Sequence, residues 1–285
     1  MKKFVENLLM QCCIVLILSV LALLIGPIRI AHSGATWRLP QEKHVLFCGA
    51  SAITLGINDS LTVSAVNISK RSERYMYTYV KLKRYISNNP QIDTIFIQFA
   101  PTDMWQNADD KYFMNEQLEY LPMYWSLLGQ QEWKWLSKDL MHIAEVVIPR
   151  CRNRFNWSID AYKLANGGYA TEYRCFDEVR DYPKQVTSEM YNGNRINHLY
   201  CQKIIDLCDD NNIKLYFLYL PVWKQDVAYD LDYYYNTYHE KFSEVELIDY
   251  SRIEMEDCER FDAHHLNSNG ARKITPMLCA EYNVR

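Results

Sequence analysis

The 285-residue sequence contains little glycine and little proline, nine residues of each. Collagen-like and low-complexity chains contain far more of both residue types. Disordered chains need a much lower apolar fraction than the 49% found here. The sequence therefore predicts a folded protein, long enough for one large domain or at most two around a sizeable core.

The sequence also lacks an excess of positive charge, because 31 lysines and arginines face 35 aspartates and glutamates. Proteins that bind nucleic acid through its phosphates carry a basic surplus, so we expect no nucleic-acid partner. No Walker A loop, Gly-x-Gly-x-x-Gly, His-Glu-x-x-His or Cys-x-x-Cys motif occurs. We therefore expect no cofactor and no metal. A mean hydropathy of −0.30 excludes a polytopic membrane protein.

One long apolar run is present, over residues 8–28, and its 21 residues at about 1.5 Å each match a hydrocarbon core of about 30 Å. Lys2 and Lys3 precede it, which favours a cytoplasmic amino terminus. We expect residues 1–36 to be a tail and a transmembrane anchor in a bacterial-type cytoplasmic membrane. Residues 37–285 would then form one extracytoplasmic domain. A signal peptide cleaved near Ser33-Gly34-Ala35 is the alternative, but the apolar run is long for one.

Nine cysteines occur, two of them within the apolar run. The remaining seven are an odd number, so at least one thiol stays unpaired within a monomer. In an oxidising compartment Cys151 and Cys175 are able to pair, although spacing does not fix connectivity. Buried free cysteine is the interpretation favoured for most of them.

The rest of the chain alternates between strand and helix patterns. Nearly continuous apolar runs at 45–48, 95–99, 215–220 and 247–250 are typical of parallel strands covered on both faces, and 62–68 is a weaker candidate. Helical spacing of apolar residues covers 76–86, 130–147, 196–207 and 271–282. This alternation predicts a doubly wound α/β sheet.

An insertion over about 105–188 interrupts the alternation, because it is too long for a single crossover. It is rich in aromatic residues. One interpretation is a lid whose rings stack on a sugar; the favoured one is that the rings fill a small core belonging to the insertion. The rings concerned are Trp105, Tyr112, Phe113, Tyr120, Tyr124, Trp125, Trp133, Trp135, Trp157, Tyr162, Tyr169 and Tyr173.

Two motifs from opposite ends of the chain carry the expected chemistry. Gly49-Ala50-Ser51 directly follows the first strand, at the strand end where open α/β sheets bind ligands. Asp262-Ala263-His264-His265 lies between the last strand and the last helix. A nucleophilic serine needs an imidazole to take its proton and a carboxylate to orient that imidazole. Ser51, His265 and Asp262 are therefore the candidate triad, with His264 as a neighbour lining the crevice.

These motifs resemble the SGNH (GDSL-like) hydrolases, especially membrane-anchored relatives that act on cell-envelope polymers. The resemblance covers about residues 44–283, with nucleophile, third and acid–base blocks at 45–51, 95–103 and 262–265. It implies a flavodoxin-like three-layer α/β sandwich with a parallel sheet. It also implies Ser51 as nucleophile, His265 as general base and Asp262 as its orienting partner. The implied reactions are hydrolysis or transfer of acyl groups, commonly acetyl esters of carbohydrates.

The chain departs from the family pattern around the oxyanion hole. Ala50 stands where the family has Asp or Asn, no glycine occurs near Ser69, and Thr102 stands where an Asn amide is usual. The Ser69 amide and the Thr102 hydroxyl are the candidate replacements, and Asp103 is a further candidate contact. Losing one donor can cost about 10²–10³ in rate.

Three functions remain open from the sequence. The leading one is an exported, membrane-anchored serine esterase or O-acyltransferase acting on an acylated carbohydrate or cell-wall polymer. The second is a catalytically impaired domain that binds glycan or docks a membrane acyltransferase. The third is an unrelated α/β protein in which the Asp-x-x-His motif is coincidental.

Overall fold

The computed structural model describes residues 2–104, 118, 120–145, 158–165, 167–181, 195–224 and 231–285. Its centre is a parallel sheet in the order β2-β1-β3-β4-β5. This is the flavodoxin-like strand order, in which the crevice for ligands lies where the direction of winding reverses, between β1 and β3. The strands are β1 (Val45–Cys48), β2 (Ala65–Asn67), β3 (Thr94–Gln98), β4 (Lys214–Tyr219) and β5 (Glu246–Asp249).

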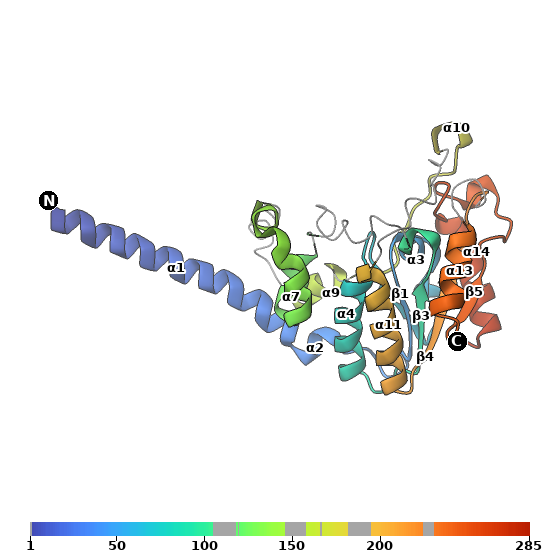
Figure 1. The fold of residues 1–285 in the computed structure, drawn as a ribbon, viewed down its shortest axis with the longest axis horizontal. Coiled ribbons are helices and arrows are strands. Elements are labelled where there is room, and N and C mark those ends of the chain that lie inside the picture. Colours follow the sequence, from blue (N-terminus) through green and yellow to red (C-terminus); the bar gives the residue numbers. More distant parts are fainter. Residues whose placement is uncertain are drawn as a thin grey trace.

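Helices cover both faces of the sheet and make a mixed α/β fold of three layers (Figure 1). One face packs against α4 (Tyr75–Asn88), α11 (Arg195–Asp210) and α13 (Leu231–Lys241). The other packs against α3 (Ser51–Gly56) and α14 (Ser268–Glu281). The strands are apolar on both faces because both faces are buried, and all four residues of β1 are at most 2% exposed.

The sequence pattern located these elements well. The five expected strands are confirmed to within a few residues, including the weak candidate at 62–68, which contains β2. The helices expected around 76–86, 196–207 and 271–282 are confirmed as α4, α11 and α14. The helix expected over 130–147 begins as α7 (Gln130–Leu136) and is interrupted by the 3-10 turn η6 (Ser137–Asp139). Helical conformation resumes over 140–145, and residues 146–147 lie outside the described residues.

Shorter elements join these parts. Between α1 (Lys2–His32) and β1 lies α2 (Gly34–Trp37), and η1 (Asp59–Leu61) precedes β2. After β3 come η2 (Pro101–Asp103), α6 (Leu121–Tyr124), η5 (Trp125–Leu127), α9 (Ile159–Ala165) and α10 (Glu178–Asp181), and η8 (Asp257–Glu259) follows β5.

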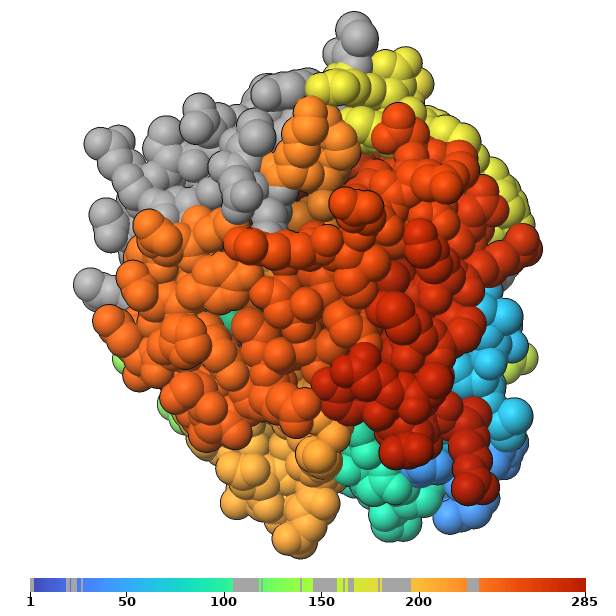
Figure 2. Space-filling view, turned by 90° about the vertical axis from the view of Figure 1, so that its right-hand side faces the viewer, coloured from blue at the N-terminus to red at the C-terminus, as the bar shows by residue number. Residues whose placement is uncertain are grey.

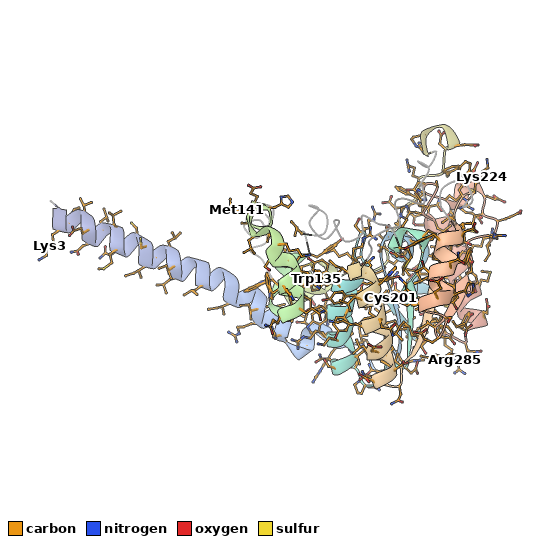
Figure 3. All side chains as sticks on the ribbon, in the orientation of Figure 1. Lys3, Trp135, Met141, Cys201, Lys224 and Arg285 are labelled. Atoms are coloured by element: carbon orange, nitrogen blue, oxygen red, sulfur yellow. The ribbon has the colours of Figure 1, made fainter. Side chains whose placement is uncertain are left out.

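Residues 8–28 lie within α1 (Lys2–His32), which extends away from the sheet (Figure 1). Its last turn is attached to the domain, where Trp37 Nε1 donates to the Ala31 carbonyl oxygen at 2.8 Å. Between Phe4 and Ile25, the large apolar side chains that the structure describes are 47–70% exposed, and they stand clear of the domain in Figure 3. No helix in the described part of the chain is long and apolar enough to span a membrane. The membrane anchor expected over residues 8–28 stays a prediction.

The described aromatic rings of the insertion mostly join the main core. Tyr120, Tyr124 and Tyr162 are at most 4% exposed and belong to the same cluster as Tyr77 and Trp37. They therefore fill the principal core rather than a separate one, whereas Tyr173 is 62% exposed. Trp105, Tyr112, Phe113 and Trp157 lie outside the described residues.

Buried free thiols account for four cysteines, as expected: Cys48, Cys201, Cys208 and Cys279. Burial raises the pKa of the Cys208 thiol to about 12, so that thiol stays protonated at neutral pH. Cys151 lies outside the described residues, but Cys175 carries a free thiol, so the pairing considered for these two cysteines is not found.

The carboxyl-terminal segment closes over one end of the sheet. Figure 2 shows this side, on which the last part of the chain, in orange and red, covers most of the view. The Arg285 carbonyl oxygen accepts hydrogen bonds from Val63 N and Ser64 N at 2.7 and 2.6 Å. The last residue is thereby tied to the start of β2.

Candidate active site

Ser51 lies where β1 ends and α3 begins, at the crevice end of the sheet. The turn before it needs a glycine, because Gly49 has φ of +140°, a conformation that L side chains rarely adopt. A Cβ at Gly49 would also lie 2.4 Å from Gln98 Cβ on the neighbouring strand. This tight turn brings the serine close to β3.

His265 and Asp262 lie on the loop between β5 and α14. Asn267 caps α14, accepting from Asn269 N and Gly270 N through Oδ1, while its amide group donates to three carbonyl oxygens of neighbouring loops. The Ala263 carbonyl oxygen accepts from Trp223 N at 2.9 Å. The loop is therefore fixed at both ends, which holds its side chains over the sheet edge.

The two motifs meet in a complete relay. Ser51 Oγ lies 2.7 Å from His265 Nε2, although the residues are 214 positions apart in sequence. His265 Nδ1 lies 2.8 and 2.9 Å from the two carboxylate oxygens of Asp262. These are the distances expected of a nucleophile, its base and the group that orients the base.

The electrostatics of the relay favour a charged carboxylate. Burial alone would raise the pKa of Asp262, but the hydrogen bond from His265 and the neighbouring imidazoles together hold it below its usual range. The His264 amide also donates to Asp262 Oδ1, at 2.8 Å. Burial, followed by the proximity of His265, lowers the pKa of the His264 imidazole. Asp262 is thus ionised and His264 neutral at neutral pH.

A small pocket of about 170 Å³ opens at the relay. It brings together most of the residues expected from the sequence: Ser51, Thr102, Asp103, His264 and His265 all line it. Part of its wall is alanine, which leaves room beside the serine. The alanines are Ala50, Ala52 and Ala100.

Ser69 lies outside this pocket, contrary to the role considered for its amide. The residue is fully buried, and both its amide and its hydroxyl donate to Asn67 Oδ1. Because that acceptor occupies the amide hydrogen, the geometry disfavours Ser69 as an oxyanion donor. The Asn67 amide group in turn donates to the carbonyl oxygens of Ile53 and Ile57 in and after α3. Ser69 therefore helps to fix the loop after β2 against the nucleophile helix.

A buried ion pair supports the same loop. Lys81 and Glu73 have fully buried side chains, and Lys81 Nζ lies 2.7 Å from Glu73 Oε1. Lys81 Nζ also donates to the Ile68 carbonyl oxygen at 2.5 Å. Removing one member of such a pair leaves an uncompensated buried charge, so the pair commits the loop to one position.

Asp103 serves chiefly to hold the loop after β3. Its carboxylate accepts from Ala100 N at 2.9 Å and from Gln98 Nε2 at 3.1 and 3.3 Å. Gln98 Oε1 accepts from Ala50 N at 3.1 Å, so one glutamine side chain joins this loop to the serine turn. Sequence reasoning missed Gln98, although a lone amide within an apolar strand is a usable signal of a buried hydrogen-bond network.

Part of the insertion passes directly beside the site. Gly167 has φ of +130°, and a Cβ there would lie 2.3 Å from the Ser69 carbonyl oxygen. Gly168 N donates to that same oxygen, and Ala170 N donates to the Thr54 carbonyl oxygen. This segment therefore links the loop after β2 with α3, a contact that nothing in the sequence indicated.

In the part of the chain that is described, no group of three or more His, Cys, Asp or Glu side chains is placed to hold a metal ion. The chemistry available at the site is that of serine, imidazole and carboxylate.

Comparison with known proteins gives distant structural likenesses. No family model matches the sequence, and no curated protein matches it. A Bacteroides fragilis protein provisionally named an acylhydrolase aligns over 90% of this chain and 94% of its own, with 12% identity and a TM-score of 0.41. A Streptococcus pneumonia protein provisionally named a platelet activating factor aligns over 95% and 98%, with 13% identity and the same TM-score. Likenesses this remote carry no argument about function.

Proposed function

We propose that this protein is a serine esterase or O-acyltransferase of SGNH type that acts on acyl esters, in particular acetyl esters, of an envelope polysaccharide. The observation that carries the proposal is the relay itself. Ser51 Oγ lies 2.7 Å from His265 Nε2, and His265 Nδ1 lies 2.8 Å from Asp262. A structural serine needs no such aligned base.

In the proposed reaction, Ser51 Oγ attacks the acyl carbonyl carbon while His265 Nε2 takes the hydroxyl proton. Asp262 accepts the hydrogen bond from Nδ1–H and stabilises the imidazolium. Collapse of the tetrahedral intermediate breaks the ester bond, and His265 returns the proton to the departing alcohol. Water or a sugar hydroxyl then attacks the acyl-serine, gives its proton to His265, and releases an acid or a new ester.

The chain departs from the family pattern at the oxyanion hole, so the hydrogen-bond donors to the developing oxyanion are assigned from the residues at this site. We assign the first to the Ser51 backbone amide, because amides of the first helical turn have no partner within the helix. The Thr102 hydroxyl is the second, since Thr102 lines the pocket and Ser69 does not. A hydroxyl donor in place of an amide fits a slower, specialised enzyme.

The pocket volume supports a short acyl group. A space of about 170 Å³ walled partly by alanine accommodates an acetyl group beside Ser51. We propose that the polymer that donates or accepts the acyl group is an acylated carbohydrate or cell-wall polymer. We also propose that a membrane acyltransferase acts with the domain.

We also propose that residues 8–28 attach the domain to a membrane, with the α/β domain on its extracytoplasmic side. Support comes from the exposed apolar side chains between Phe4 and Ile25, an unusual surface for a monomer in water. The full chain should sediment with membranes in a salt and carbonate wash, whereas a chain that starts at residue 37 should not. Equal recovery of both in the supernatant would contradict this attachment.

The test of the activity is covalent labelling of the nucleophile. A fluorophosphonate probe should label the full chain, and Ser51→Ala should remove the label and the hydrolysis of p-nitrophenyl acetate. The matched control is Ser60→Ala, because Ser60 lies in η1, where its hydroxyl donates to Asn58 Oδ1. That variant should label normally.

The alternative of a domain that only binds gives a different result. In that case neither the wild type nor the Ser60→Ala variant reacts with the probe or turns over an acyl ester. Glycan binding would then survive in a Ser51→Ala/His265→Ala double variant.

A further inference from the structure

Arg74 places a positive charge in the wall of the catalytic pocket. It is the N-cap residue of α4, only 8% of its surface is exposed, and it lines the same pocket as Ser51 and His265. Arginine is rarely this buried unless its guanidinium is paired. The partners of the side chain therefore indicate what it does.

Protein groups use only part of the donors of Arg74. Nη1 donates to the Thr102 carbonyl oxygen at 3.1 Å. Its separation from Asp103 Oδ1 is 3.7 Å, which is too long for a hydrogen bond. Among the described residues, the buried Nε has no hydrogen-bond partner. A guanidinium has five N–H donors in a planar fork, so donors remain for a molecule in the pocket.

The nearest carboxylate pairs with the charge of Arg74 but does not use its hydrogen-bond donors. Asp103 lies 3.7 Å from Arg74 Nη1, and its oxygens accept hydrogen bonds from Gln98 Nε2 and Ala100 N instead. The other carboxylate at the site, Asp262, is bound to His265. An arginine with unused donors in a partly enclosed pocket is suited to bidentate recognition of a carboxylate or a phosphate.

We propose that Arg74 binds an anionic group of the substrate, a carboxylate or a phosphate, while Ser51 acts on an acyl ester of the same molecule. This inference rests on the proposed function and narrows its substrate to an acylated glycan or polyol that carries negative charge. The anion accepts hydrogen bonds from the guanidinium of Arg74, which lines the pocket. It also fixes the position of the ester relative to the serine.

The test compares three acetyl esters built on one ring: an acetylated methyl glucoside, its uronic acid, and its 6-phosphate. Binding is measured by calorimetry in the Ser51→Ala background, so that no ester is consumed. One of the anionic esters should bind about tenfold to hundredfold more tightly than the neutral ester. The better of the two identifies the anion as carboxylate or phosphate.

Adding Arg74→Met should bring the ratio of anionic to neutral affinity down to about one, and Arg74→Lys should retain part of it, because lysine keeps the charge without the fork. The matched control is Arg71→Met, because Arg71 lies three residues earlier and pairs with Glu172 at the surface. Its ratio should not change. Thermal unfolding reports whether each variant folds, and Arg74→Lys carries the test if Arg74→Met does not.

Equal affinity for neutral and anionic esters in the Ser51→Ala protein would overturn the inference, as would an anionic preference that survives both Arg74 substitutions. Neither result affects the proposed function, which depends on labelling and turnover in the Ser51-containing protein. Conversely, an unlabelled, inactive protein that still prefers the anionic ester through Arg74 removes the enzymatic step and keeps the anion site.

Discussion

The pocket and the loops around it contain two groups of residues that keep to the expected motif pattern to different degrees. The relay group, Ser51, His265 and Asp262, has the residues and distances that its motifs predict. The loop group, formed by residues 67–74 after β2 and 98–103 after β3, departs from the pattern at nearly every position with a known role. It carries side-chain networks where the resemblance leads us to expect glycine and asparagine.

The difference shows that the loop group is held by buried polar side chains. Asn67 binds Ser69 to α3, Gln98 binds the serine turn to Asp103, and Lys81 binds the Ile68 carbonyl oxygen. Each network has many members, so each is costly to disturb and fixes the loops in one arrangement. In the proposed function the relay supplies the chemistry, and the loops limit which substrates fit beside it.

The largest expected effect concerns the relay group and should appear in the catalytic rate. Asp262→Asn should lower kcat for acetyl ester hydrolysis about 10³–10⁴-fold, because an amide no longer stabilises the imidazolium or selects its tautomer. Steady-state kinetics at saturating ester measure this, and Asp209→Asn at the exposed end of α11 is the control. A loss of less than about tenfold would show that the relay is not used.

The next effect concerns the loop group and should appear in stability. Lys81→Met should lower the free energy of unfolding by about 3–5 kcal/mol, since it leaves the Glu73 carboxylate buried without its partner. Urea denaturation measures the change. Lys83→Met, on the exposed side of the same helix, should change stability by less than about 1 kcal/mol.

A double variant sharpens this result. Replacing both partners, Lys81→Met with Glu73→Leu, should restore most of the lost stability, because apolar pairs of similar volume are often neutral replacements. Turnover should stay impaired, because the loop after β2 has lost the hydrogen bond from Lys81 Nζ to the Ile68 carbonyl oxygen. Full recovery of turnover in the double variant would argue against a positioning role for Lys81.

The smallest effect belongs to neither group and separates global stability from site chemistry. Burial, with a contribution from Lys241, lowers the pKa of His198 on α11 to about 4. The unfolded chain takes up this proton near pH 6.5 and the folded protein does not, so stability falls as the pH drops from about 7 towards 4. Between pH 7 and pH 5, the free energy of unfolding should fall by about 1–2 kcal/mol more in wild type than in His198→Phe. The figure allows for the ring being only partly buried.

Urea denaturation at the two pH values checks this prediction. If wild type and His198→Phe lose stability equally, His198 is not the group responsible. If the His198→Phe variant keeps its stability at pH 5 but loses turnover as wild type does, that loss of turnover reports on the relay and not on unfolding.

How far the sequence predicts the molecule follows from the kind of signal each part leaves. The strands are found because burial on both faces makes them continuously apolar, as at Val45–Cys48. The relay is found because its residue types and their places at strand ends are restricted by chemistry. Arg74, Asn67 and Gly167 could not be found in this way, because their roles depend on contacts between segments that only the fold brings together. Ser69 illustrates the limit, since its amide is committed to a side chain two residues away.

The separation of Ser51 from His265 by 214 positions has a consequence for synthesis. A chain emerging from the ribosome exposes its serine early, but the base arrives only when the final loop has been translated and α14 has docked against α3. Until then the Ser51 hydroxyl has no imidazole beside it to take its proton. The relay therefore forms only when the polypeptide is nearly complete, and a nonsense mutation anywhere before the last loop leaves the serine without its base.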